Sequence, residues 1–77
     1  MPANVHFLRK LASDELMDTL FFATGERVVK KKEPTHWVLS AGGIDVKIVT
    51  NRKIILNSRY RCKTVPDAKL MIQEMIS

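Results

Sequence analysis

The sequence predicts an α+β fold in the order helix, three- or four-stranded antiparallel sheet, helix, with both helices packed on one face of the sheet. Three observations support this prediction: apolar residues recur at helical spacing near both ends, the middle alternates like strands, and a Gly-Gly pair joins two of the alternating runs. Each helix has an apolar face that needs cover, and an antiparallel sheet offers one apolar face while the other meets water. The 77 residues are expected to form a single small domain, residues 1–77.

The first helix is expected over residues 13–24. Ser13 is the candidate N-cap, because its hydroxyl can accept from the orphan N–H groups of a first turn and two acids follow it. Gly25 stands where a left-handed residue ends a helix. The segment before Ser13 fits either a short helix from Asn4 or a strand. The expected core stripe of the main helix consists of Leu16, Met17, Leu20 and Phe21.

A hairpin is expected around Gly42-Gly43, a pair that tolerates the positive φ of a tight two-residue turn. Such a turn fixes the register of the two strands, and it places Trp37 opposite Ile48, with the side chains of both on one face of the hairpin. Trp37 is therefore expected in the core rather than on a base-stacking surface. The predicted pairs are Ala41 with Ile44, Leu39 with Val46, and Trp37 with Ile48. The predicted opposite face carries His36, Val38, Ser40, Asp45, Lys47 and Val49.

Further strands flank the hairpin in the prediction. Residues 27–32 form a strand that ends at Glu33-Pro34, because proline cannot donate to a ladder. Residues 54–56 form another short strand, and Asn57-Ser58 then breaks the pattern. In residues 59–63 the cations alternate with Tyr60 and Cys62, which predicts a strand with a basic outer face. A second helix is expected at about residues 65–76, capped by Thr64.

Positive charge is concentrated in this central part of the chain. Residues 27–63 carry a net charge of +8, whereas the first 26 residues carry −2 and the last 14 carry −1, for +5 in total. Lysines on an exposed strand edge protect against aggregation, but three consecutive lysines and alternating arginines exceed what that role usually needs. Arginine and lysine both suit phosphate oxygens. The candidate phosphate contacts are Lys31, Lys32, Arg52, Lys53, Arg59, Arg61 and Lys63.

These cations predict a small basic, non-enzymatic accessory module that contacts nucleic-acid phosphates through a cationic sheet face or edge. No aromatic signature for reading bases is visible, and the choice between DNA and RNA stays open. One alternative is a protein-interaction module that forms a homodimer or docks an acidic partner, because Val29, Val38, Val49 and Ile55 are expected on the open face.

Several other classes of protein are disfavoured by the sequence. Cys62 is the only cysteine, which leaves no intrachain disulfide and no cysteine-rich metal site. His6 and His36 have no carboxylate or thiol at ligand spacing, so no metal and no cofactor are expected. The start of the chain lacks the pattern of a signal peptide and no apolar run is long enough to span a bilayer, so a cytoplasmic protein without a membrane partner is expected.

His36 is the one candidate for catalysis. It is expected on the outer face beside Lys31, where a histidine can act as a general acid or base on RNA. The order of Gly25, the run Lys30-Lys31-Lys32-Glu33-Pro34-Thr35-His36 and the following hairpin loosely resembles HicA-type toxin ribonucleases over about residues 13–49. The resemblance implies a small α-β-β-β-α scaffold with a single catalytic histidine at His36. Pro34-Thr35 stands where that family has a Gly-Ser pair, and an extra strand follows Val49.

Overall fold

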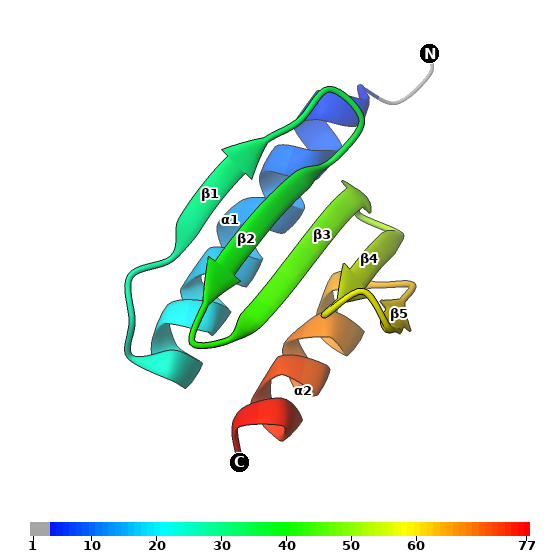
Figure 1. Ribbon diagram of the computed structural model, residues 1–77. Helices are drawn as coiled ribbons and strands as arrows, with labels where there is room; N and C mark the ends of the chain where they lie inside the picture. Colours follow the sequence, from blue (N-terminus) through cyan, green and yellow to red (C-terminus); the bar gives the residue numbers. More distant parts are fainter. Residues whose placement is uncertain (1–3) are drawn as a thin grey trace.

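A computed structural model describes residues 4–77 of the chain (Figure 1). Residues 1–3 lie outside the described part. They belong to the predicted domain 1–77 and to the segment in which no signal peptide is expected. The predicted α+β architecture is confirmed, with two helices and an antiparallel sheet between them in sequence. The elements are helix α1 (Val5–Thr24), strands β1 (Val29–Lys32), β2 (Trp37–Ala41), β3 (Ile44–Thr50), β4 (Lys53–Leu56) and β5 (Tyr60–Cys62), and helix α2 (Val65–Ile76).

The sheet has five strands in the order of the chain, β1 to β5, and every neighbouring pair is antiparallel. The expected number was three or four. All five strands lie in segments that were expected as strands, and β5 pairs with β4 because Asn57 and Ser58 both adopt positive φ and turn the chain back. The β2–β3 hairpin has the predicted register, with Trp37 opposite Ile48. Its turn packs closely on the end of α1, since a Cβ on Gly42 would lie 2.7 Å from Cγ2 of Thr24.

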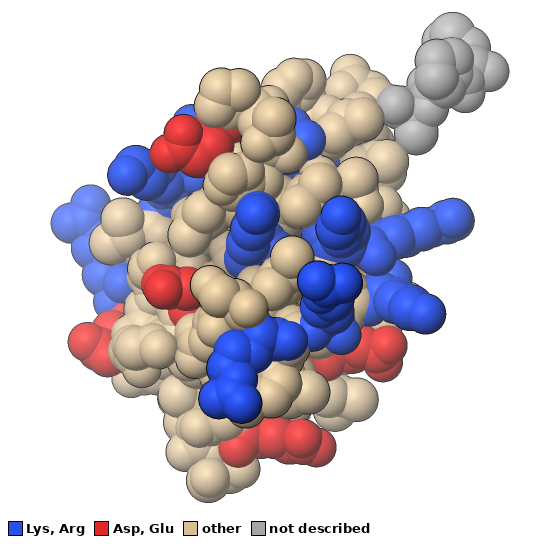
Figure 2. All heavy atoms as spheres, turned by 45° about the vertical axis from the view of Figure 1, so that its right-hand side comes forward, with Lys and Arg blue, Asp and Glu red and all other residues tan. Residues whose placement is uncertain are grey.

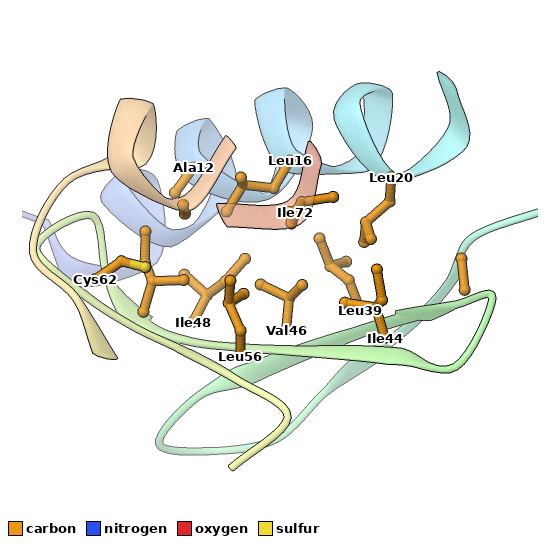
Figure 3. Packing of buried hydrophobic residues seen from close by; sticks show 13 residues of the cluster. Ala12, Leu16, Leu20, Leu39, Ile44, Val46, Ile48, Leu56, Cys62 and Ile72 are labelled. Atoms are coloured by element: carbon orange, nitrogen blue, oxygen red, sulfur yellow. The ribbon is translucent and has the colours of Figure 1, made fainter. Parts of the chain in front are cut away.

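Both helices cover the same face of the sheet, and the core lies between the two layers (Figure 3). α1 packs on β2 and β3, and α2 packs on β4 and β5. Trp37, predicted on the core face, is only 6% exposed. The opposite face of the sheet has no helix over it, as Figure 3 also shows. Fully buried side chains of this core are Leu16, Leu20, Leu39, Val46, Ile48, Ile54, Leu56 and Ile72.

The expected start of the main helix at Ser13 was wrong, and of the two alternatives for the segment before it, the helix from Asn4 is the one that forms, continuous with the main helix. α1 begins at Val5, where the Asn4 side chain accepts from the amide of Phe7, and runs unbroken through Ser13. Ser13 is fully buried in the middle of the helix, facing the sheet. Phe21, placed in the core stripe by its spacing, is 51% exposed, because the buried positions Ala12, Ser13, Leu16 and Leu20 centre the stripe elsewhere. A hydroxyl followed by acids has the local pattern of an N-cap, but packing of the preceding turns on the sheet determines where the helix begins.

Arg9 ties the first half of α1 to the sheet. Its side chain is buried, and its Nε donates to the carbonyl oxygen of Val49 at 2.6 Å. One Nη donates to the carbonyl oxygen of Thr35 at 2.5 Å, and the other makes a longer contact of 3.5 Å with that of Pro34. The end of β3 and the loop before β2 are thus held by one guanidinium, which the sequence reasoning did not single out.

Helix α2 has the predicted bounds and the predicted cap. The hydroxyl of Thr64 accepts from the amide of Asp67 at 3.1 Å. Ala68 and Ile72 are buried, while Ile76, the last residue of the helix, is 42% exposed. An ion pair between Lys69 and Glu15, at 3.2 Å, links α2 to α1.

Candidate nucleic-acid interface

The open face of the sheet carries a row of five residues that crosses all five strands. Directly opposed residues of an antiparallel pair point to the same face, so the register of each pair extends the row. Neighbouring strands lie about 4.8 Å apart, which spaces the three cations of the row by roughly 10 Å. We call it the cross-strand row, and it consists of Lys31, Val38, Lys47, Ile55 and Arg61.

The two apolar members of the row are half-buried, whereas the three cations are exposed. Cations and apolar residues alternate along the row, because each strand contributes one outward-pointing residue that lies opposite the residue contributed by the next strand. Lys47 was predicted on this face but was not among the proposed phosphate contacts. The predicted hairpin register already placed Lys47 on the same face as Val38, and this position was the signal that could have added it.

A shallow hollow of about 460 Å³ lies along part of this row. Val38 and Ile55 supply its apolar part, and Lys31 and Lys47 supply positive charge. Two acids, Glu33 and Asp45, also line it, so the hollow is not purely cationic. Its remaining lining residues are His36, Ser40 and Ser58.

Asp45 is the most firmly placed polar group of the hollow. Its Oδ1 accepts from the hydroxyl of Ser40 at 2.8 Å, across the β2–β3 pair. Its amide donates to Oδ1 of Asn57 at 2.7 Å, and its carbonyl oxygen accepts from the amide of Asn57 at 2.8 Å. These contacts fix a carboxylate beside the row, on a rigid strand.

His36 also lines the hollow, on the residue just before β2. Its Nδ1 lies 3.0 Å from the hydroxyl of Thr35, and its carbonyl oxygen accepts from the amide of Glu33. Because Arg9 holds the carbonyl of Thr35, the loop that carries His36 is anchored to α1.

Lys32 lies apart from the other proposed contacts. It pairs with Trp37, and therefore points to the helix-bearing side of the sheet, where Lys31 does not. Its Nζ lies 4.7 Å from the centroid of the Trp37 ring, and Nζ of Lys30 lies 4.6 Å from it. Both ammonium groups cover the aromatic ring at the β1 edge, where a cation is attracted to the π-face. Two of the three consecutive lysines thus contact the core tryptophan.

The cations at the β5 side lie near Arg61 of the row. Arg59 and Lys63 immediately flank β5, and the guanidinium of Arg59 lies 5.4 Å from the centre of the Tyr60 ring. Arg52 and Lys53 lie at the β3–β4 turn, where Lys53 pairs with Thr50. That turn is at the end of the sheet, away from the hollow.

The exposed cations of the sheet have no acidic partners. Within residues 4–77, the ion pairs shorter than 4 Å join Lys10 to Asp14 and Lys69 to Glu15, all on the helices. Figure 2 shows Lys and Arg side chains gathered across the middle of the view, where the β4–β5 side of Figure 1 comes forward, with most acidic side chains around them. Unpaired positive charge is therefore available on the sheet side of the molecule.

The helix side has a different character. Another open hollow, of about 400 Å³, lies between α1 and α2 and contains Glu15 and Asp18 beside Phe22, which is 82% exposed. In the described part of the chain, no three His, Cys, Asp or Glu side chains are grouped so that they could hold a metal ion. Of the two helices, neither has both the length and the apolar character needed to cross a membrane.

Comparisons with known protein families, with curated proteins and with solved structures found no match to this chain. The candidate interface therefore depends on the geometry of the sheet alone.

Proposed function

We propose that the protein is a small, non-enzymatic nucleic-acid-binding module whose open sheet face contacts phosphates. The observation that carries the proposal is the cross-strand row, in which Lys31, Lys47 and Arg61 lie on one face without acidic partners in residues 4–77. Arg59 and Lys63 extend this charge along β5. A backbone-directed surface of this kind needs no base-stacking aromatic residue, which agrees with the burial of Trp37.

The test is the salt dependence of binding. Fluorescence anisotropy with labelled mixed-sequence DNA and RNA would be measured between about 50 and 200 mM salt. If five cations each neutralise one phosphate of a single strand, the plot of log K against log salt has a slope of about −3.5. Absence of binding, or binding that ignores salt, would remove the proposal.

A matched pair of triple variants locates the surface. Neutralising the row with Lys31→Gln, Lys47→Gln and Arg61→Gln should make the slope shallower by about 2 on single strands. The control neutralises Lys10 and Lys69 on the two helices and Arg27 in the loop before β1 instead, which gives the same net charge and leaves the cross-strand row intact. Equal losses in both proteins would mean that overall charge, rather than this face, attracts the nucleic acid.

A second candidate function is RNA cleavage at the same face. It is favoured by one observation, that His36 lines the hollow together with Lys31 and Lys47. A histidine near cations that attract a phosphodiester is an arrangement that supports general acid–base chemistry. The resemblance to HicA-type toxins points to the same residue.

Docking of an acidic protein or of a second copy uses the same surface and is the third candidate. Its specific support is apolar area on the open face, with Val29 62% exposed and Val38 half-buried in the hollow. It predicts a stable dimer, or a complex with an acidic protein, that Val38→Lys disrupts. Sedimentation of the wild type and this variant distinguishes it from phosphate binding, because an added lysine should strengthen contacts with nucleic acid.

A further inference from the structure

The hollow contains a group that a simple phosphate-binding surface would lack. Asp45 is exposed on the open face, near the row cations Lys31 and Lys47 that line the same hollow. A carboxylate repels phosphate, so its natural counterpart is a hydrogen-bond donor. The ligand that covers this part of the face therefore has to bring N–H groups as well as negative charge.

The carboxylate is also oriented. The hydroxyl of Ser40 donates to its Oδ1, and both backbone polar atoms of Asp45 are bound to Asn57. Within residues 4–77, no hydrogen bond reaches the other carboxylate oxygen, Oδ2. A fixed acceptor with free lone pairs thus lies at the hollow, on a strand rather than on a mobile loop.

The apolar part of the hollow suits a flat ring. Val38 and Ile55 are half-buried members of the cross-strand row, and Lys47 lies between them. A nucleobase placed on the side chain of Val38 and on the methylene stem of Lys47 beside it would have Asp45 near its edge, while its phosphates meet the charged ends of the lysines. Adenine, cytosine and guanine carry an exocyclic amino group that can donate to a carboxylate, as Asp does with cytosine N4, whereas uracil and thymine carry none.

A base in a duplex cannot make this contact. Its faces are stacked on its neighbours, so only an unpaired base can lay a face on the apolar part of the hollow. We propose that the open face binds single-stranded nucleic acid and selects bases that carry an exocyclic amino group, with Asp45 as the acceptor. This inference rests on the proposed function, because it assigns the nucleic-acid class to the same surface.

The experiment compares two single strands of equal backbone charge with a duplex that carries about twice as many phosphates. Labelled 12-nucleotide oligomers of cytidine and of uridine, and a mixed-sequence duplex of the same length, are titrated with the full chain at fixed salt. We expect the cytidine strand to bind at least about five-fold more tightly than the uridine strand, and the duplex to bind more weakly than the cytidine strand. A duplex that binds as tightly as the cytidine strand overturns the inference.

Asp45→Asn identifies the residue responsible. The amide keeps the size of the side chain but removes its charge and one acceptor, so we expect the cytidine-to-uridine ratio to fall to about one. Binding of the uridine strand should tighten at the same time, because the repulsion of its phosphates is lost. The control Asp18→Asn makes the same charge change on α1 and should leave the ratio as in the wild type.

The outcomes separate the two proposals. Salt-sensitive binding of all three probes with equal affinity, unchanged in Asp45→Asn, rejects base selection while the phosphate interface stands. Failure of every probe to bind rejects the proposed function itself. Circular dichroism of each variant confirms that it is folded before its affinities are compared.

Discussion

The guanidinium of Arg9 donates to the carbonyl oxygen of Val49 at 2.6 Å, across the boundary between helix α1 and the end of strand β3. The same side chain donates to the carbonyl of Thr35, in the loop before β2. No carboxylate within residues 4–77 lies within 4 Å of Arg9, so its charge is satisfied by backbone dipoles alone. Arg9 therefore holds in place one end of the face that carries the candidate interface.

We expect Arg9→Met to be strongly destabilising. The variant leaves partly buried carbonyl oxygens without donors, which should lower the free energy of unfolding by about 2–3 kcal/mol. Urea denaturation followed by circular dichroism measures this change. The neighbouring Lys10→Met, on the exposed side of the same helix, should cost less than about 1 kcal/mol. Similar midpoints for Arg9→Met and the wild type would mean that the contacts with Val49 and Thr35 do not stabilise the fold.

Replacing Ser13 by alanine should change the free energy of unfolding in a direction that depends on whether Ser13 lies inside the helix or caps it. Its Oγ is buried and has no hydrogen-bond partner within residues 4–77. Ser13→Ala removes an unsatisfied polar atom and improves helix propensity, so the free energy of unfolding should rise by about 1 kcal/mol. An N-cap serine would instead lose about 0.5–2 kcal/mol on the same change.

Thr64→Ala is the matched control for Ser13→Ala, because Thr64 does cap a helix, α2. It should lower the free energy of unfolding by about 1 kcal/mol. Thermal unfolding of both variants measures the two signs. A loss of stability in Ser13→Ala would contradict the absence of a hydrogen-bond partner for its hydroxyl among the described residues.

Much of the fold follows from local sequence signals. The Gly42-Gly43 turn and the alternation on either side predict the β2–β3 register, and Thr64 with the spacing of Ala68 and Ile72 predicts α2. The beginning of α1 does not follow, because Ser13 carries a cap signal that is stronger locally than that of Asn4. What overrides it is burial of the helix against the sheet, which no short window of sequence contains.

The candidate interface could be predicted only in part for the same reason. Charge counts identify the basic segment, but they do not tell which side of the sheet each cation occupies. Alternation assigns Lys31 and Arg61 to the open face, whereas the position of Lys32 depends on its pairing with Trp37. The hairpin alone places Lys47 and Asp45 on one face, but Lys31 and Ile55 join that surface only when the pairing of β1 and β4 is known.

Neutralising Lys30 and Lys32 should therefore have a different effect on stability from neutralising Lys31, which points to the other face of the sheet. Lys30 and Lys32 lie over the ring of Trp37, and each such contact contributes about 0.5–1 kcal/mol. We expect the double variant Lys30→Gln/Lys32→Gln to lose stability and to shift the fluorescence of Trp37, the single tryptophan of the chain. The control Lys31→Gln should leave both properties unchanged. The assignment of faces is wrong if Lys31→Gln shifts the fluorescence as much as the double variant does.

Cys62 gives a prediction about alkaline pH. Burial raises the pKa of the Cys62 thiol above its ordinary value, and the negative charge of Asp67 raises it further. A raised pKa in the folded state means that the native protein keeps a proton that the unfolded chain releases. This contribution to stability is complete below the unfolded pKa, about 8.5, and is lost as pH rises through the folded value.

The free energy of unfolding of the wild type should thus fall more steeply above about pH 8.5 than that of Cys62→Ala. Urea titrations of both proteins at several pH values between 7 and 10 measure the difference. Alkylation of the native thiol by iodoacetamide at pH 7.5 should be slow compared with the urea-unfolded chain. Parallel pH curves for the two proteins would contradict the raised pKa.

His36 decides between binding and cleavage. The proposed function places the charge for phosphate contact on Lys31, Lys47 and Arg61, so His36→Gln should change the affinity for RNA by less than about threefold. RNA incubated with either protein should be recovered at full length on a denaturing gel. If the wild type cleaves RNA, and folded His36→Gln does so at least about 100-fold more slowly, the histidine acts as a general acid or base and the second candidate function replaces the first. Cleavage that is equal in both proteins would instead exclude His36 as its source, since loss of a catalytic acid or base cannot leave the rate unchanged.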